Sequence, residues 1–267
     1  MQLVHVEVED SIALVGLANP PLNLLSRPVL EELYRALRSV AEMQHVSVVV
    51  IRSKVPGVFS AGSDMTEFPE VSQDPLNRKI LFEDYVLRFL ERLPVPTIAE
   101  IDGHALGGGL ELALACDLRV ATYGSTLGLP EVKIGGLGTN GLVRLIGIVG
   151  KSRALDLVYT GRSLSGTEAL DIGLLNRAAD ILPHSVADEE SLARVISLQS
   201  RTSLRFAKRL ASSQAASTLD EHLDEGIRLQ LEVFGSPDLI AGSAAFLAKR
   251  PIEFPSHQTR ATRGSKP

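Results

Sequence analysis

Three consecutive glycines, Gly107 to Gly109, stand where a strand-like segment passes into an apolar helical one. Before them, residues 97–101 have the apolar and β-branched character of a buried strand, and residues 110–116 are apolar in a way typical of a helix. Glycine allows close approach of the backbone because it has no Cβ, and the first turn of a helix carries free N–H groups. The segment therefore predicts either a closely packed strand-to-helix turn or a site that holds a developing anion.

Strands and helices alternate through about the first two thirds of the chain, after which helices dominate. This order favours an α/β core over residues 1–190 with a helical region over residues 191–255. Residues 256–267 are polar, and we expect them to form a disordered tail. The predicted elements are a hairpin at 4–9 and 12–17, a helix from Ser26, a strand at 46–51, a loop at 53–63, a helix at 76–93 and a strand at 118–122.

Helix starts in the second half are marked by capping residues. Ser165 with Glu168 and Thr218 with Glu221 each match the Ser/Thr-x-x-Glu capping box, in which two side chains satisfy helix N–H groups reciprocally. Ser236 followed by proline predicts the start of a last helix, through Leu247.

Composition excludes several classes of protein. Cys116 is the only cysteine, so the chain has no intrachain disulfide, and its apolar neighbours predict a buried thiol. A net charge of −5 argues against nucleic acid as the main partner. The apolar runs are too short to cross a membrane, and the first ten residues read as a strand and not as a secretion signal. We therefore expect a cytoplasmic protein.

Common catalytic motifs are incomplete. Gly150-Lys151-Ser152 resembles the end of a phosphate-binding loop, but Leu145 stands where that loop needs its first glycine. The glycine triplet lacks the third glycine of a dinucleotide fingerprint, since position 112 is leucine. Neither Gly-x-Ser-x-Gly nor His-Glu-x-x-His occurs. Serine hydrolases, zinc enzymes and nicotinamide dehydrogenases are disfavoured.

Two loops and one shorter segment carry motifs in a fixed order. Residues 59–65 read Phe-Ser-Ala-Gly-Ser-Asp-Met, residues 96–117 end in Gly-Gly-Gly-Leu-Glu-Leu-Ala-Leu-Ala-Cys-Asp, and residues 128–131 read Gly-Leu-Pro-Glu. Together they resemble the crotonase (enoyl-CoA hydratase/isomerase) family, whose segments read Phe-x-Ala-Gly-x-Asp and Pro-x-Ile-Ala followed by Gly-Gly-Gly-x-Glu-Leu-Ala-x-x-Cys-Asp. The resemblance extends from about Asn19 to Pro251.

This resemblance implies an α/β fold of the ClpP/crotonase type, a spiral of repeated ββα units with a C-terminal helical region that forms trimers. It implies an acyl-CoA thioester as ligand and a homotrimer or dimer of trimers. It implies no metal and no other cofactor, because coenzyme A arrives as part of the substrate. The charge and the short apolar runs described above, and not the resemblance, favour neither nucleic acid nor a membrane as partner.

The resemblance also assigns roles to four residues. The backbone N–H groups of Ser63 and Gly108 form an oxyanion hole for the thioester oxygen of an enolate. Glu111 and Glu131 occupy the positions of the family's catalytic glutamates, with Glu111 handling water and Glu131 the Cα proton. Taken singly, Glu111 could instead complement a helix N-terminus, and Glu131 could be an exposed turn residue.

Further substrate contacts follow from the same resemblance. Ser63 departs from the alanine common in hydratases, and residues 135–138, Gly-Gly-Leu-Gly, depart from the family's proline-containing stretch. Lys249 could contact coenzyme A phosphates or be a solvated helix end. The predicted substrate-binding residues are Asn23, Leu24, Ala61, Gly62, Asp64, Met65, Gly107 and Lys249.

Three functions remain open at this point. Hydration of a trans-2-enoyl-CoA leads, because two acids suit the addition of water. A shift of a double bond between positions 3 and 2 is the alternative, since it needs the same oxyanion hole and one acid. A thioester-binding scaffold, including an RNA-binding role, is the third; the 4% content of aromatic residues speaks against RNA.

Overall fold

Two sheets organise the first two thirds of the chain in this computed structural model, which describes residues 2–182, 191–213 and 218–258. One sheet has six strands in the order β1-β2-β3-β5-β7-β10, and the other has four in the order β4-β6-β8-β9. The strands are β1 (Val4–Glu9), β2 (Ile12–Leu17), β3 (Val48–Ser53), β4 (Val58–Ser60), β5 (Thr97–Ile101), β6 (His104–Leu106), β7 (Leu118–Thr122), β8 (Thr126–Gly128), β9 (Ser163–Ser165) and β10 (Arg177–Ala179).

Burial explains the pairing in the larger sheet. β1 alternates in exposure and lies at an edge, antiparallel to β2, as the hairpin prediction required. β2 is buried along its whole length, and β3 is buried over its first four residues. Strands buried on both faces favour parallel pairing with helical connections, and β2, β3, β5, β7 and β10 pair in parallel.

The same unit occurs three times. β3 with β4, β5 with β6, and β7 with β8 each place their first strand in the larger sheet and their second in the smaller one, and helical structure follows each pair. β4, β6 and β8 pair in parallel, and β9 is antiparallel to β8. The predicted ββα repeat is confirmed. The prediction of an uninterrupted loop over 53–63 is wrong, because β4 lies inside it.

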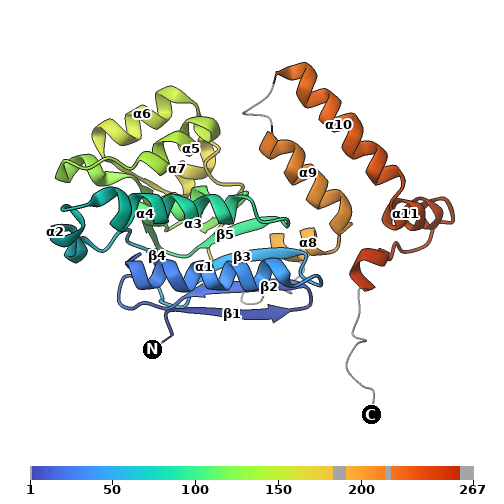
Figure 1. Cartoon of the computed structure of the whole chain (residues 1–267), viewed down its shortest axis with the longest axis horizontal. Coiled ribbons are helices and arrows are strands. Elements are labelled where there is room, and N and C mark those ends of the chain that lie inside the picture. Colours follow the sequence, from blue (N-terminus) through green and yellow to red (C-terminus); the bar gives the residue numbers. More distant parts are fainter. Residues whose placement is uncertain (1, 183–190, 214–217, 259–267) are drawn as a thin grey trace, which may run out of the picture.

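Helices cover the sheets and form the C-terminal region (Figure 1). In the core they are α1 (Arg27–Glu42), α2 (Phe68–Val71), α3 (Leu81–Glu91), α4 (Gly108–Leu114), α5 (Thr139–Val149), α6 (Lys151–Thr160) and α7 (Gly166–Asp171). After them come α8 (Leu192–Ser197), α9 (Arg201–Ser213), α10 (Leu219–Phe234) and α11 (Pro237–Leu247). Short 3-10 segments are η1 (Met65–Glu67), η3 (Pro130–Ile134) and η5 (Pro255–Gln258), and η2 (Leu76–Ile80) is a π-helical turn.

The capping boxes of α7 and α10 are both present as predicted.

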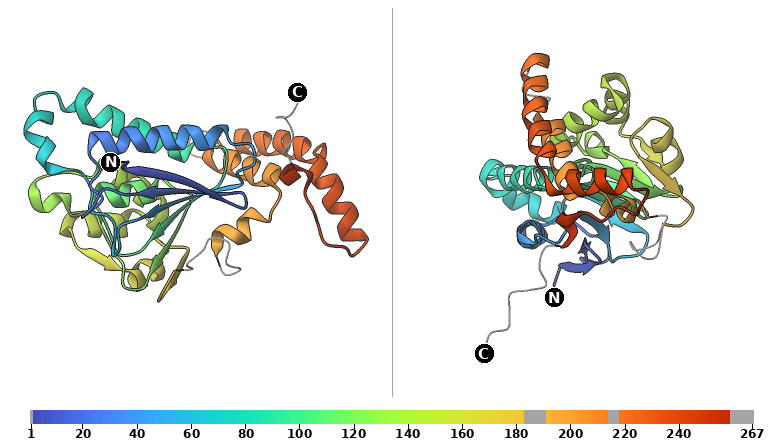
Figure 2. Two further views of the ribbon diagram at one scale, coloured as in Figure 1. Left: turned by 90° about the horizontal axis from the view of Figure 1, so that it is seen from below. Right: turned by 90° about the vertical axis from the view of Figure 1, so that its right-hand side faces the viewer.

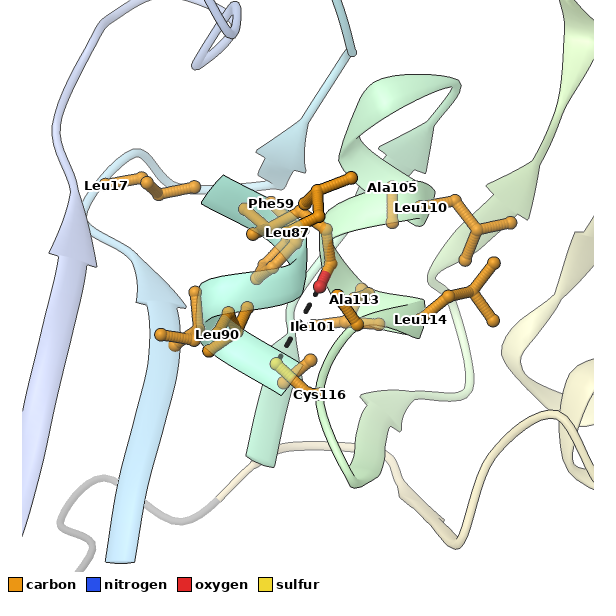
Figure 3. Close-up of a cluster of buried hydrophobic side chains, with 14 of the residues drawn as sticks. Leu17, Phe59, Leu87, Leu90, Ile101, Ala105, Leu110, Ala113, Leu114 and Cys116 are labelled. Atoms are coloured by element: carbon orange, nitrogen blue, oxygen red, sulfur yellow. Dashed lines mark hydrogen bonds between the residues drawn. The ribbon is translucent and has the colours of Figure 1, made fainter. Parts of the chain in front are cut away.

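The helix that follows the glycine triplet is entirely buried. All residues of α4 are buried, and its apolar side chains pack with α3 and the strands (Figure 3). Cys116 lies in this cluster, where its thiol contacts the Leu112 carbonyl at 3.8 Å and burial raises its pKa to about 12. A thiol with so high a pKa is a poor nucleophile. The core therefore fixes α4, and with it the glycines at its start.

The C-terminal helices α9 to α11 extend away from the sheets (Figure 2). The prediction of disorder from residue 256 is wrong for 256–258, because the Ser256 N–H and hydroxyl donate to the Asp238 carboxylate at 2.8 and 2.6 Å. Residues 259–267 lie outside the described residues. Among the described helices, none is both long and apolar enough to cross a membrane.

Candidate active site

The glycine triplet is both a packed turn and the start of a helix. Gly107 has a φ of 53°, a left-handed conformation that favours glycine, and its N–H donates to the Gly128 carbonyl at 2.9 Å. α4 begins at Gly108, two residues earlier than predicted. A Cβ on Gly109 would lie 2.3 Å from the Ser60 carbonyl oxygen, so α4 packs directly on the end of β4. The two sequence interpretations of the triplet are therefore compatible.

The N–H groups of Ser63 and Gly108 lie close together. Gly62, with a φ of 99°, turns the first loop so tightly that a Cβ there would lie 3.1 Å from the Gly108 nitrogen. A Cβ on Gly108 would in turn lie 3.5 Å from the Ser63 nitrogen. Within the described residues neither N–H donates to a protein acceptor. Two neighbouring unpaired donors are what a thioester oxyanion requires.

Glu111 lies in the first turn of α4 with its carboxyl group buried. Its Oε1 accepts the Gly141 N–H at 2.7 Å, and Gly141 belongs to the first turn of α5. The pKa of Glu111 is raised to about 7, chiefly by burial; the Gly141 N–H and the Lys79 charge oppose the shift, and the charges of Glu83 and Glu131 add to it. The carboxyl can therefore exchange a proton near neutral pH.

Glu131 is the second residue of η3, and one of its oxygens is buried. Among the described residues its Oε2 has no hydrogen-bond partner, and burial raises its pKa, with Glu83 adding to the shift. A Cβ on Gly107 would lie 2.9 Å from Oε1, and one on Gly138 would lie 3.0 Å from it. The glycines at 107 and 138 therefore make room for this carboxyl, and Glu131 is not the exposed turn residue of the alternative interpretation.

The smaller sheet explains why residues far apart in sequence meet. β4, β6 and β8 are adjacent and parallel. Ser63 follows β4, Gly108 follows β6 and Glu131 follows β8, each within three residues of the strand end. Carboxyl ends of parallel strands lie at one edge of a sheet, which is the usual place of a ligand site. Each repeat therefore contributes one group.

Two charged residues at this site, Lys79 and Glu83, were not predicted from the sequence. The Lys79 Nζ donates to the Ser63 hydroxyl at 2.9 Å and pairs with Glu83 at 2.8 Å. The Glu83 Oε1 lies 3.5 Å from the position of a Cβ on Gly108. Lys and Glu four residues apart are normally a solvated helix pair. One feature of the sequence does indicate burial: the helical spacing places Glu83 on the same face of α3 as the buried Val86, Leu87 and Leu90.

The loop residues predicted to bind substrate have mixed outcomes. Gly62 and Gly107 lie at the site, as described above. The Asn23 side chain is buried, donates to Ser53 and to the Phe59 carbonyl, and accepts the Asn19 N–H, so its amide supports the loop and is not available to a substrate.

The segment after Asn23 runs beside the first loop. The Leu25 N–H donates to the Gly62 carbonyl at 2.8 Å, and the Ala61 N–H donates to the Leu22 carbonyl at 3.0 Å. Leu24 and Ala61 therefore lie next to the N–H groups of Ser63 and Gly108, and their contacts with a thioester remain predictions.

Three predicted contacts differ in what the structure offers a ligand. Asp64 caps η1, accepting from the Thr66 N–H at 2.9 Å. Met65 is exposed and available for contact. Lys249 follows α11, at the end of the molecule away from α2 (Figure 1). Within one chain Lys249 is not brought to the site, because α9 to α11 carry it away from the sheets.

Comparisons with known proteins agree with this geometry. The sequence pattern of the enoyl-CoA hydratase/isomerase family matches residues 7–257. The chain is 34% identical over 257 residues to a probable enoyl-CoA hydratase of Bacillus subtilis, covering 95% of this chain and 99% of that protein. It is 35% identical over 270 residues to the mitochondrial methylglutaconyl-CoA hydratase of Mus musculus, covering 95% and 83%. The crystal structure of an enoyl-CoA hydratase from Bacillus anthracis superposes with a TM-score of 0.88 at 30% identity, covering 96% of this chain and 100% of that one.

Proposed function

We propose that this chain, which belongs to the enoyl-CoA hydratase/isomerase family, is an enoyl-CoA hydratase that adds water to a trans-2-enoyl-CoA thioester. The observation that carries the proposal is the convergence of two unpaired N–H groups, from Ser63 and Gly108, with two carboxyl groups, those of buried Glu111 and partly buried Glu131, whose pKa values are raised. Relatives named as enoyl-CoA hydratases support the same activity.

Each group has a defined part in the addition. Ionised Glu111 removes a proton from water, and the water oxygen bonds to Cβ of the enoyl group. The electron pair of the double bond moves towards the thioester, where the N–H groups of Ser63 and Gly108 stabilise the enolate oxygen. Protonated Glu131 then gives its proton to Cα. Transfer of a proton from Glu111 to Glu131, through water, restores the starting state.

Double-bond isomerisation is the second candidate, and one observation favours it. The Glu131 carboxyl has an unpartnered oxygen among the described residues, whereas Glu111 is held by the Gly141 N–H. A single mobile acid suffices to move a proton between Cα and Cγ of a 3-enoyl-CoA. In that case Glu111→Gln would leave turnover nearly intact and Glu131→Gln would abolish it.

Parallel assays on one preparation separate the two candidates. Hydration of trans-2-butenoyl-CoA is followed by loss of the conjugated double bond, and isomerisation of trans-3-hexenoyl-CoA by its appearance. We expect hydration to have the higher kcat/KM. Faster isomerisation would favour the second candidate, and absence of both would favour a thioester-binding scaffold.

The C-terminal helices support assembly into a homo-oligomer. Large apolar side chains on α10 and α11 are more than half exposed in the single chain, among them Ile227, Leu231, Phe234 and Phe246. Exposed apolar surface of this extent is typical of an interface. We infer a homotrimer or dimer of trimers, which sedimentation equilibrium would distinguish from a monomer. In this proposal the active site needs no metal and no separate cofactor, because side chains of this protein supply both acids.

A further inference from the structure

The Lys79–Glu83 ion pair lies inside the site and not on the surface. The two side chains are 19% and 9% exposed, whereas the Asp84–Arg88 pair on the same helix is 29% and 56% exposed. Glu83 raises the pKa of both Glu111 and Glu131, and Lys79 lowers that of Glu111. The Lys79 Nζ donates to the Ser63 hydroxyl at 2.9 Å, and the Glu83 Oε1 lies 3.5 Å from the position of a Cβ on Gly108, so the ion pair lies beside the two N–H groups.

The position of the thioester places the acyl group against this pair. A thioester oxygen at the Ser63 and Gly108 N–H groups lies beside the Gly108 Cα, and a Cβ there would meet the Ser63 hydroxyl at 3.4 Å and the Glu83 Oε1 at 3.5 Å. An acyl group that extends from the two N–H groups past the Gly108 Cα would therefore contact the charged side chains of Lys79 and Glu83. Covering an ion pair with a hydrocarbon chain removes water from both charges without replacing its hydrogen bonds.

The pair still has hydrogen-bonding capacity. A lysine ammonium has three N–H donors. Within the described residues its polar partners are the Ser63 hydroxyl and the Glu83 Oε2, which leaves one donor. The Glu83 Oε1 is free as an acceptor in the same part of the chain. A hydroxyl group can use both, because it accepts from the ammonium and donates to the carboxylate.

An anionic acyl group is disfavoured at the same place. Lys79 is already neutralised by Glu83, and the carboxyl groups of Glu111 and Glu131 face the same space. A carboxylate on the substrate would add a further negative charge without an unpaired cation to meet it.

We propose that the Lys79–Glu83 pair determines acyl specificity, favouring enoyl groups that carry an uncharged hydroxyl over alkyl or carboxylated groups of equal length. The inference rests on the proposed hydratase function and names the substrate class of that site. A site that hydrogen-bonds a substrate hydroxyl rejects the analogue without it, because its buried polar groups are then left unpaired.

The test compares four substrates of equal chain length: trans-2-hexenoyl-CoA, its 5-hydroxy and 6-hydroxy derivatives, and trans-2-hexenedioyl-CoA, which ends in a carboxylate. For the unmodified protein we expect at least one hydroxylated substrate to exceed hexenoyl-CoA in kcat/KM by about tenfold or more. We expect the carboxylated substrate to be the poorest. A preference for hexenoyl-CoA or for the carboxylate overturns the inference.

The variant Lys79→Met with Glu83→Leu removes both charges together, so that neither is left unpaired. In this variant, the ratio of kcat/KM for the hydroxylated substrate to kcat/KM for hexenoyl-CoA should fall by about tenfold or more. Asp84→Leu with Arg88→Met is the matched control, since it removes an exposed ion pair of the same helix, and its substrate ratio should equal that of the unmodified protein. An unchanged ratio in a folded Lys79/Glu83 variant contradicts the inference.

The substrate ratio of the unmodified protein decides the question if that variant does not fold. Failure of the proposed function is distinguishable, because the unmodified protein would then hydrate none of the four substrates.

Discussion

Ser63 presents two different groups to the site. Its N–H faces the Gly108 backbone, and its hydroxyl accepts from Lys79 at 2.9 Å. From the sequence we expect a backbone role only, because Ser63 directly follows Gly62, at the position of the family's N–H donor, where alanine is the common residue. The hydroxyl has a partner of its own, whereas in the proposed mechanism the N–H stabilises the thioester oxygen.

Ser63→Ala keeps the N–H and removes the hydroxyl. We expect kcat for hydration of trans-2-butenoyl-CoA to fall less than about tenfold, because losing a true oxyanion-hole donor costs about 10²–10³ in kcat. The measurement is steady-state kinetics, with circular dichroism as the control for folding. A loss of 10² or more in a folded protein would show that the hydroxyl takes part in the chemistry.

In the proposed mechanism, Glu111 determines how activity falls on the acid side of the pH profile. Its pKa is raised to about 7 in the folded protein, and the proposed base is active only when ionised. We therefore expect kcat/KM for hydration to fall as the pH drops below about 7, by about tenfold for each further pH unit. A profile that stays flat down to pH 5, with the protein still folded, would contradict the assignment of Glu111 as the base.

Elements with a long, regular pattern were predictable, and short ones were not. The hairpin β1–β2, helix α1 and the two capping boxes follow from local periodicity or cap chemistry. β4 and β6 have three residues each, too few to show a period, and they exist because the neighbouring strands of the smaller sheet pair with them. The role of Lys79 and Glu83 depends on how α3 is placed over α4, which no local pattern encodes.

The contact between α4 and β4 is an element-scale test of the site. A Cβ on Gly109 would lie 2.3 Å from the Ser60 carbonyl oxygen, so α4 must move to accept alanine. We expect Gly109→Ala to lower the free energy of unfolding by about 1–3 kcal/mol. The same movement displaces the Gly108 N–H, so kcat should fall as well. Urea unfolding and steady-state kinetics measure the two effects.

Gly147→Ala is the matched control. Gly147 lies within α5, and a Cβ there would have no neighbour within 4 Å. Because alanine is the better helix former, this change should stabilise the protein by roughly 0.5–1 kcal/mol and leave kcat unaltered. Equal stability effects of the two substitutions would show that α4 is not packed on β4 as described.

At the scale of the whole molecule, the repeated ββα unit places the chemistry. Three successive units end at one edge of the smaller sheet, and the groups that follow β4, β6 and β8 surround the same space. The order of these units could be inferred from the resemblance of three motifs. The orientation of the two carboxyl groups depends on Gly107, Gly138 and Gly141, whose contacts appear only in three dimensions.

Two single glutamine substitutions test the central claim that two acids act on a thioester held by two N–H groups. Glutamine preserves the size of each side chain but cannot exchange the proton. The measurement is kcat for hydration of trans-2-butenoyl-CoA by Glu111→Gln and Glu131→Gln, with binding of butanoyl-CoA measured by calorimetry as the control. We predict that kcat falls by about 10²–10⁴ in each variant while butanoyl-CoA still binds. Near-normal hydration in either variant would contradict the two-acid mechanism.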